Sequence, residues 1–134
     1  MGTPLSEVYD AFFIKSGLDY LSKENQVFQF FKTGVGKSKK IVLIDLNYTI
    51  DENFDGEFIN ILEQDVIELI ALNMLLEEKR QKKSILDYAK EHIGTKDFNR
   101  VPNKLNEYKI LSQSMDDLID EIKDLEQTFK SYSN

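Results

Sequence analysis

Two stretches near the N-terminus carry apolar side chains at helical spacing. Thr3 and Pro4 precede the first stretch as an N-cap and a first helical residue, and Gly17 follows it, which predicts a helix ending near Lys15. The second predicts a helix from about residue 22 that ends at the glycines 34 and 36. The apolar residues that define the two helices are Leu5, Val8, Tyr9, Phe12, Phe13, Val27, Phe28, Phe30 and Phe31.

The pattern then changes to a continuous run of β-branched and aliphatic residues. Residues 41–46 read Ile-Val-Leu-Ile-Asp-Leu, which is typical of a buried strand or extended segment. Residues 48–50 could pair with this run only across a very tight turn, and an acidic loop, 51–57, follows. We therefore expect a short extended or β segment near residues 41–50.

The most hydrophobic segment lies at residues 66–76, where little polar face remains. A helix that is apolar on nearly all sides belongs at the centre of a bundle. The sequence becomes strongly charged over residues 77–83, so the far end of this helix, or its continuation to His92, should emerge into solvent. Gly94 is the predicted end.

The clearest periodicity lies after Pro102, where apolar residues recur in steps of three and four. It predicts a long amphipathic C-terminal helix with a narrow apolar seam. The chain is thus expected to be mainly α, a small helical bundle forming a single helical domain over residues 1–134. The seam consists of Leu105, Tyr108, Leu111, Met115, Leu118, Ile122, Leu125, Phe129 and Tyr132.

Composition narrows the classes of function. The absence of cysteine removes disulfides, thiolate zinc sites and cysteine nucleophiles. The 41% of apolar and 31% of charged residues indicate a soluble folded chain, neither disordered nor membrane-spanning. A net charge of −7 disfavours general nucleic-acid binding. Basic clusters at 37–40 and 79–83 stand apart from an acidic stretch at 116–126, a separation that suits head-to-tail contact between neighbouring copies at least as well as nucleic acid.

Residues 34–38, Gly-Val-Gly-Lys-Ser, end like a phosphate-binding loop. The first glycine of that motif would fall at Phe31, and the segment follows a predicted helix where a phosphate-binding loop follows a strand. A helix end with a lysine-rich turn accounts for it better.

Residues 51–56, Asp-Glu-Asn-Phe-Asp-Gly, match the start of a calcium loop. Oxygen ligands stand at the first, third and fifth positions and glycine at the sixth, but the twelfth is Leu62 where a bidentate glutamate is required. The acidic residues Asp116, Asp117, Asp120, Glu121 and Asp124 are expected on a solvated helix face. With one histidine, His92, and no cysteine, we expect no enzyme activity, no cofactor and no metal site.

Several segments together resemble a family of small virion proteins from tailed phages of Gram-positive bacteria. These are the opening Met1-Gly2-Thr3 with residues 5–12, the central run at residues 68–74, the loop 96–98 and the helix entry 103–105. The chain departs from the family in lacking a tryptophan after the central helix, where residues 77–80 stand, and in residues 34–50.

The resemblance implies a head–tail connector or neck protein that forms a homo-oligomeric ring beneath the portal. Its implied partners are further copies, the portal and other neck or tail proteins, and DNA only as it passes through a channel; no membrane is involved. The protein would be assembled in the host cytoplasm and reside in the virion. The candidate assembly contacts are Lys79, Arg80, Lys82, Lys83, Asp97, Phe98, Phe129 and Tyr132.

Two other classes of function remain open at this point. One is a non-virion helical adaptor or regulator that binds a partner helix through the seam at 105–132. The other is a weak nucleotide or ion binder that uses residues 34–38 or 51–56.

Overall fold

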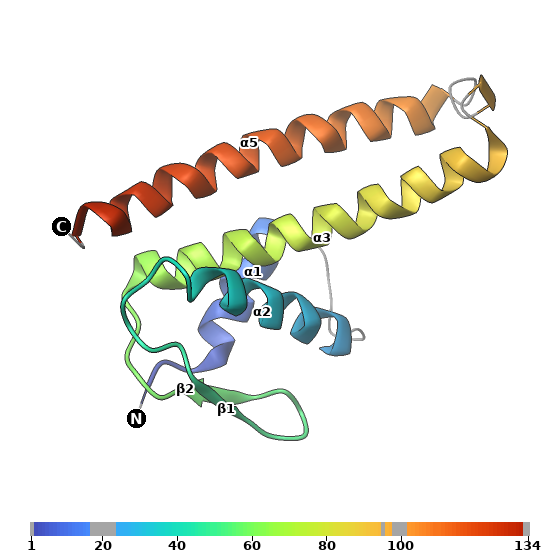
Figure 1. Ribbon diagram of the computed structural model, residues 1–134. Helices are drawn as coiled ribbons and strands as arrows, with labels where there is room; N and C mark the ends of the chain where they lie inside the picture. Colours follow the sequence, from blue (N-terminus) through green and yellow to red (C-terminus); the bar gives the residue numbers. More distant parts are fainter. Residues whose placement is uncertain (1, 17–23, 95, 98–101, 133–134) are drawn as a thin grey trace.

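The computed structural model describes residues 2–16, 24–94, 96–97 and 102–132. This part of the chain is mainly helical, with a small two-stranded antiparallel sheet and a long C-terminal helix, as predicted (Figure 1). The elements are α1 (Leu5–Ser16), α2 (Glu24–Ser38), β1 (Tyr48–Ile50), β2 (Gly56–Phe58), α3 (Gln64–Ile93) and α5 (Pro102–Tyr132).

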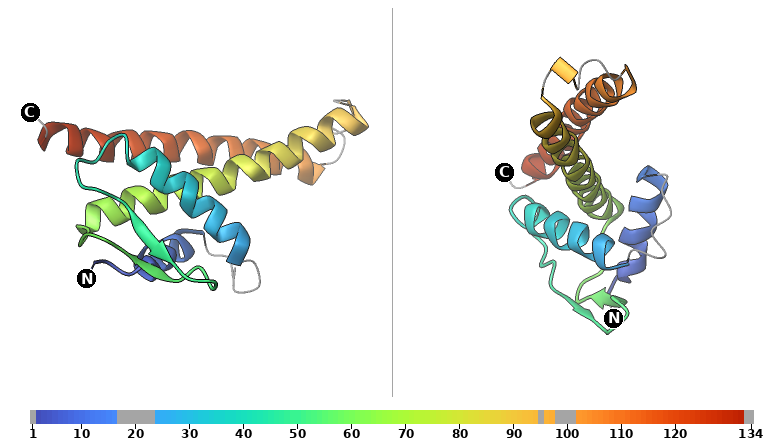
Figure 2. Two further views of the ribbon diagram at one scale, coloured as in Figure 1. Left: turned by 60° about the horizontal axis from the view of Figure 1, so that its bottom comes forward. Right: turned by 90° about the vertical axis from the view of Figure 1, so that its right-hand side faces the viewer.

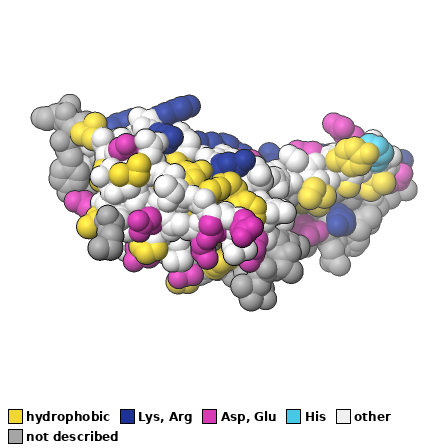
Figure 3. Space-filling model, turned by 90° about the horizontal axis from the view of Figure 1, so that it is seen from below, with side chains coloured by type: hydrophobic (Ala, Val, Ile, Leu, Met, Phe, Trp, Pro, Cys, Tyr) yellow, Lys and Arg dark blue, Asp and Glu magenta, His cyan; other side chains and the backbone are white. Residues whose placement is uncertain are grey.

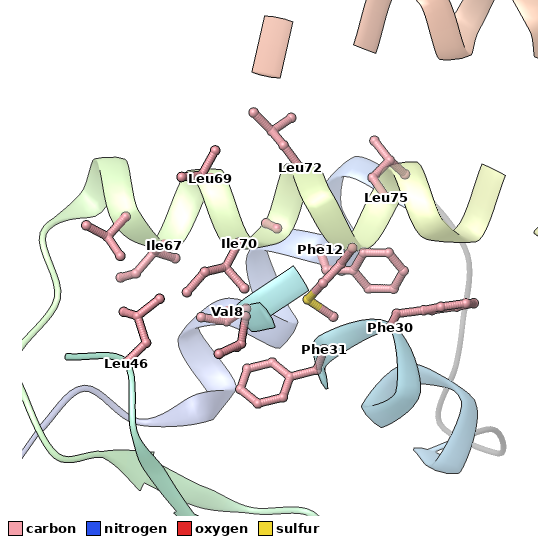
Figure 4. Close-up of a cluster of buried hydrophobic side chains, with 14 of the residues drawn as sticks. Val8, Phe12, Phe30, Phe31, Leu46, Ile67, Leu69, Ile70, Leu72 and Leu75 are labelled. Atoms are coloured by element: carbon pink, nitrogen blue, oxygen red, sulfur yellow. The ribbon is translucent and has the colours of Figure 1, made fainter. Parts of the chain in front are cut away.

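Helix α3 lies in the middle of the molecule, with α1 and α2 on one side and α5 on the other. Leu72 points from α3 toward α5, whereas Ile67 and Ile70 point from the opposite side toward α1, α2 and the loop that carries Leu46 (Figure 4). Because neighbours cover it on both sides, residues 64–78 can be apolar almost all round. We call α1, α2, the β hairpin and residues 64–78 the body.

Beyond the body, α3 and α5 continue together as an antiparallel pair, the distal hairpin (Figure 2). Gly94 ends α3 with a φ of 84°, a left-handed conformation that favours glycine, and this confirms the predicted end. Arg80 and Lys82 are exposed as predicted, but Glu78 is buried. The Ser16 hydroxyl donates a 2.8 Å hydrogen bond to the Glu78 carboxylate.

Helix α2 does not end at Gly34 or Gly36, so that prediction was wrong; it continues to Ser38. Gly34 instead marks a close approach of α2 to α3. A Cβ atom there would lie 2.8 Å from Met74 Cγ and 2.9 Å from the Ile70 carbonyl oxygen. The glycine is therefore required by helix packing, and packing outweighs its low helix propensity.

The predicted β segment near residues 41–50 is present as β1, but residues 41–46, expected as a strand or extended segment, do not form a strand. They follow α2 as a turn and irregular segment in which Val42 and Leu46 are buried while Leu43 is 83% exposed. The strand is the next segment, β1, which pairs forward with β2 in the register Tyr48↔Phe58. Without a partner strand, the run places Val42 and Leu46 in the core and leaves Leu43 and Ile44 on the surface.

Thr3 is not the N-cap of α1, contrary to the prediction. Its hydroxyl accepts a 2.7 Å hydrogen bond from the Leu62 N–H, and its backbone pairs with Phe58 and Asn60. Pro4 likewise forms a bridge to Glu57 and lies before the first helical residue. The N-terminal segment thus runs alongside β2, and this pairing uses the groups that a cap would need.

Aromatic side chains fill the space between α1, α2 and the β hairpin. The Phe31 ring is fully buried and lies 5.0 Å from the Tyr48 ring and 5.3 Å from the Tyr9 ring, centroid to centroid. The Tyr9 hydroxyl donates a 2.9 Å hydrogen bond to the Phe54 carbonyl. This cluster attaches the hairpin to the helices. It comprises Tyr9, Phe12, Phe13, Phe28, Phe30, Phe31, Tyr48, Phe54 and Phe58.

Candidate functional site

The segment that ends like a phosphate-binding loop is the last turn of α2. The Ser38 hydroxyl donates to the Gly34 carbonyl at 2.8 Å and accepts a 3.2 Å hydrogen bond from the Asn73 amide. These contacts join α2 to α3 inside the core. The backbone here ends a helix, whereas a phosphate-binding loop presents the N–H groups that begin one.

The segment that resembles a calcium loop is the turn of the β hairpin. The Asp51 carboxylate accepts hydrogen bonds from the backbone N–H groups of Asn53 at 2.8 Å and Asp55 at 3.1 Å. Gly56 stands where a Cβ would lie 1.8 Å from the Thr49 carbonyl oxygen, so strand pairing explains this glycine. The turn itself thus accounts for the residues that suggested an ion site.

The acidic residues of α5 face away from the core, as predicted. Asp116, Asp120 and Asp124 are exposed, and Asp117 accepts a 2.9 Å hydrogen bond from Gln113 one turn earlier. His92 lies in the last turn of α3, where its Nδ1 is 3.1 Å from the Tyr88 carbonyl oxygen. Among the residues that the structure describes, no group of three or more His, Asp or Glu side chains could hold a metal ion.

The predicted assembly contacts fall on several parts of the molecule. Lys83 is partly buried, with its Nζ 5.8 Å from the centre of the Tyr108 ring, and Phe129 is partly buried against the core. Asp97 is exposed in a short helical turn after α3. Phe98 and the side chain of Tyr132 lie outside the described residues. Two concave surfaces contain the remaining three residues: Lys79 and Lys82 line the first, and Arg80 lines the second. Their role as assembly contacts stays a prediction.

The first surface, which we call the distal groove, lies between α3 and α5 in the distal hairpin. Its volume is about 470 Å³. Ile85 is 68% exposed and Ile110 is 69% exposed, so two large aliphatic side chains of the groove remain largely in water. The lining residues are Lys79, Lys82, Ile85, Leu86, Lys104, Glu107, Ile110, Leu111 and Ser114.

A second apolar surface, the loop patch, lies at the opposite end of α3. It consists of Leu43 and Ile44 after α2, and Ile59 and Ile61 before α3, all exposed. Backbone hydrogen bonds hold the two segments together, with the Ile59 N–H donating to the Asn47 carbonyl at 2.9 Å. The loops that carry these side chains lie beside the start of α3, away from the distal hairpin (Figure 1).

The second concave surface, the basic pocket, was not foreseen from the sequence. It lies where the end of α2 meets α3 and α5, and it has a volume of about 340 Å³. Lys37 and Lys40 come from one basic cluster of the sequence, Arg80 comes from the other, and Lys123 comes from α5. The lysine clusters in the sequence could not show that these side chains lie close together, because their proximity depends on how α2 crosses α3.

Charge is unevenly placed on the molecular surface. Over the larger, left-hand part of the face in Figure 3, Lys and Arg side chains lie mostly along the upper edge and Asp and Glu mostly along the lower edge, with apolar side chains between them. In the described part of the chain, no helix has the length and hydrophobicity needed to cross a membrane.

No protein-family model matches the chain, and no curated protein or solved structure shows significant similarity to it.

Proposed function

We propose that this protein is a structural subunit of a tailed-phage virion, a head–tail connector that forms a ring between portal and tail. Its partners are further copies of itself, the portal and neighbouring neck or tail proteins, and it is assembled in the host cytoplasm. The proposal draws on the ordered resemblance of the sequence segments and on one structural observation, the pair of apolar surfaces at opposite ends of α3.

A closed ring with one kind of subunit requires a heterologous contact, in which two different surfaces of each copy meet. The distal groove and the loop patch are two such surfaces, each with large aliphatic side chains exposed to water, such as Ile110 in the groove and Leu43 in the loop patch. Lys79, Lys82 and Lys104 flank the groove, and the exposed aspartates of α5 offer the opposite charge. Apolar contact would supply affinity and the charges would orient the copies.

The seam of α5 supports this choice over an adaptor that binds a partner helix. Leu118 is 4% exposed and Ile122 is 5% exposed, and both belong to the same core cluster as α3. A partner helix could use the seam only after α5 left α3. The distal groove and the loop patch need no such rearrangement.

Two variants and their mixture test the heterologous contact. Ile110→Asp changes the groove and Ile61→Asp changes the loop patch, and we expect each variant to be monomeric by light scattering where the natural protein forms rings. An equimolar mixture should form a dimer, because one intact groove and one intact patch remain between the two variants. Ile14→Asp, at a side chain 83% exposed on α1, is the control and should leave the rings intact.

A natural protein that stays monomeric at high concentration and does not associate with the portal would contradict the proposal and favour the adaptor. A mixture that stays monomeric would exclude a contact between groove and patch. Gene neighbourhood gives an independent test, because we expect the adjacent genes to encode portal, capsid and tail proteins.

A further inference from the structure

The basic pocket gathers positive charge in an otherwise acidic protein. Four cationic side chains line it, Lys37, Lys40, Arg80 and Lys123, against one carboxylate, that of Glu126. They come from α2 and the turn that follows it, from α3 and from α5, and aliphatic side chains such as Ile122 form part of the lining. The whole chain has a net charge of −7, so the pocket is a region of positive charge on a negatively charged protein.

Arg80 and Lys40 lie close enough to Lys37 to lower the pKa of its ammonium group. Burial lowers the pKa of the Lys37 ammonium, the charges of Arg80 and Lys40 lower it further, and Glu77 acts in the opposite direction. Like charges held together in this way oppose folding. An anion bound among them would remove that repulsion and gain several charge-assisted hydrogen bonds.

The pocket is held in place by core contacts and does not depend on flexible side chains alone. Ser38, next to Lys37, accepts its hydrogen bond from Asn73 inside the core, and Gly34 sets the close approach of α2 to α3. Arg80 lies two helical turns after Asn73 on α3. The spacing between the cations of α2 and Arg80 is thus preorganised, which lowers the entropy lost when a ligand binds.

We propose that the basic pocket binds a phosphate group. A phosphate presents oxygen atoms in several directions, which suits donors that converge from three segments, and arginine with lysine is the usual donor set for it. A concave surface of about 340 Å³ that is lined by four cations has room for such a group. The source of the phosphate that we favour, the backbone of DNA in the channel of a connector ring, rests on the proposed function.

Titrations of the full-length protein test the site. Inorganic phosphate and a short DNA duplex are added separately and followed by NMR chemical shifts, with sodium chloride at the same ionic strength as the reference. We expect Lys37→Gln and Arg80→Gln each to weaken phosphate binding by about tenfold. Lys39→Gln is the matched control, because Lys39 is exposed next to the pocket without lining it. It should change the affinity by less than about twofold.

Thermal unfolding separates loss of the site from loss of the fold. Because Lys37→Gln removes a repelling charge, we expect this variant to unfold at or above the temperature of the natural protein without ligand. For DNA, the apparent affinity should fall steeply with salt concentration and should be lowered by the same two variants.

The outcomes differ for the site, its ligand source and the ring. Shifts with phosphate that match those with chloride, or an equal loss in Lys39→Gln, would overturn the site. Binding of phosphate without DNA would overturn DNA as the source. If Lys37→Gln and Arg80→Gln kept their affinity for phosphate but no longer formed rings, the phosphate site would be overturned. The pocket would then be a contact for an acidic segment of a neighbouring copy. Phosphate binding by a protein that never forms rings would support the pocket and contradict only the proposed function.

Discussion

The two halves of α3 belong to one continuous helix but lie in different environments. In residues 64–78 most side chains are buried between α1, α2 and α5, whereas in residues 79–93 only Leu86 is buried. The first half is stabilised by tertiary packing. The second depends on helix propensity, on ion pairs such as Lys82 with Glu78 at 3.4 Å, and on α5 as its neighbour.

The difference separates the positions that determine folding from those that are free to serve contacts. Substitutions in the body should change the free energy of unfolding. Substitutions at exposed positions of the distal hairpin should leave it nearly unchanged and act on association. The following predictions test this division, from the largest expected effect to the smallest.

Phe31→Ala should be the most damaging of these changes. The ring is fully buried and contacts the rings of Tyr9, Phe28, Tyr48 and Phe58, so its removal leaves a cavity where α2 meets the hairpin. We expect the free energy of unfolding to fall by about 3–5 kcal/mol in urea denaturation. A loss no larger than that of Ile85→Ala in the distal hairpin would contradict the division.

Gly34→Ala should destabilise the protein by about 1–3 kcal/mol, because the added methyl group has no room beside Met74 and the Ile70 carbonyl. Gly36→Ala is the matched control in the same helix. No atom lies within 4 Å of a Cβ at Gly36, so this change should stabilise the protein by about 0.5–1 kcal/mol through helix propensity. Equal effects at the two glycines would show that α2 does not pack against α3 as described.

Tyr9→Phe should reduce stability at neutral pH by about 1 kcal/mol through loss of the hydrogen bond to the Phe54 carbonyl. Burial raises the pKa of Tyr9 well above its ordinary value of 10.0, and nearby Tyr48, Asp55 and Asp51 raise it further. The folded state therefore holds this proton more tightly than the unfolded chain does, and the stability that it contributes is fully present below pH 10 and lost as the pH rises above it.

Urea denaturation at a series of alkaline pH values measures this dependence. We expect the slope of stability against pH above pH 10 to be shallower in Tyr9→Phe than in the natural protein. Part of the slope should remain, because burial also raises the pKa of Tyr48. An unchanged slope would mean that Tyr9 does not titrate as its burial implies.

Ile110→Asp should change the free energy of unfolding of the monomer by less than about 0.5 kcal/mol, because the side chain is 69% exposed. Measurement at a concentration at which the protein is monomeric isolates this effect from association. A loss comparable to that of a core substitution would show that the distal groove is a folding element instead of a contact surface.

The features that could be predicted from the sequence are those that depend on residues close together along the chain. The apolar run at residues 66–76 and the spacing of the α5 seam follow from helical periodicity, and both helices occupy the expected parts of the chain. Gly94 ends α3 with a positive φ, a conformation that glycine adopts easily. Such a helix end depends on local backbone geometry, so it could be predicted from the sequence.

The predictions that were wrong depended on partners distant in sequence. Gly34 resembles a helix end until Met74 and Ile70 are seen to pack against it, and Thr3 resembles an N-cap until Leu62 uses its hydroxyl. Glu78 stands among charged residues, yet Ser16 of α1 meets it in the core. At each of these positions the local sequence suggests one role, but a contact with a residue distant in sequence gives the side chain a different one.

The same distinction holds for the candidate sites. The two loops with ligand-like motifs had clear sequence signals, and backbone hydrogen bonds within the fold account for both. The basic pocket had no continuous motif, since Lys37 and Arg80 stand on different helices. A pattern that spans helices becomes visible only when their crossing is known.

The unbroken length of α3 has a mechanical consequence. Thirty residues in one continuous helix form a rod of about 45 Å, which can carry an axial push or a twist from one end to the other. At Gly34 the rod meets α2 with no slack, because even a methyl group would collide there. A push on the tip therefore moves α2 together with α3, keeps the spacing of Lys37 and Arg80, and displaces the positive field of the basic pocket as a rigid unit.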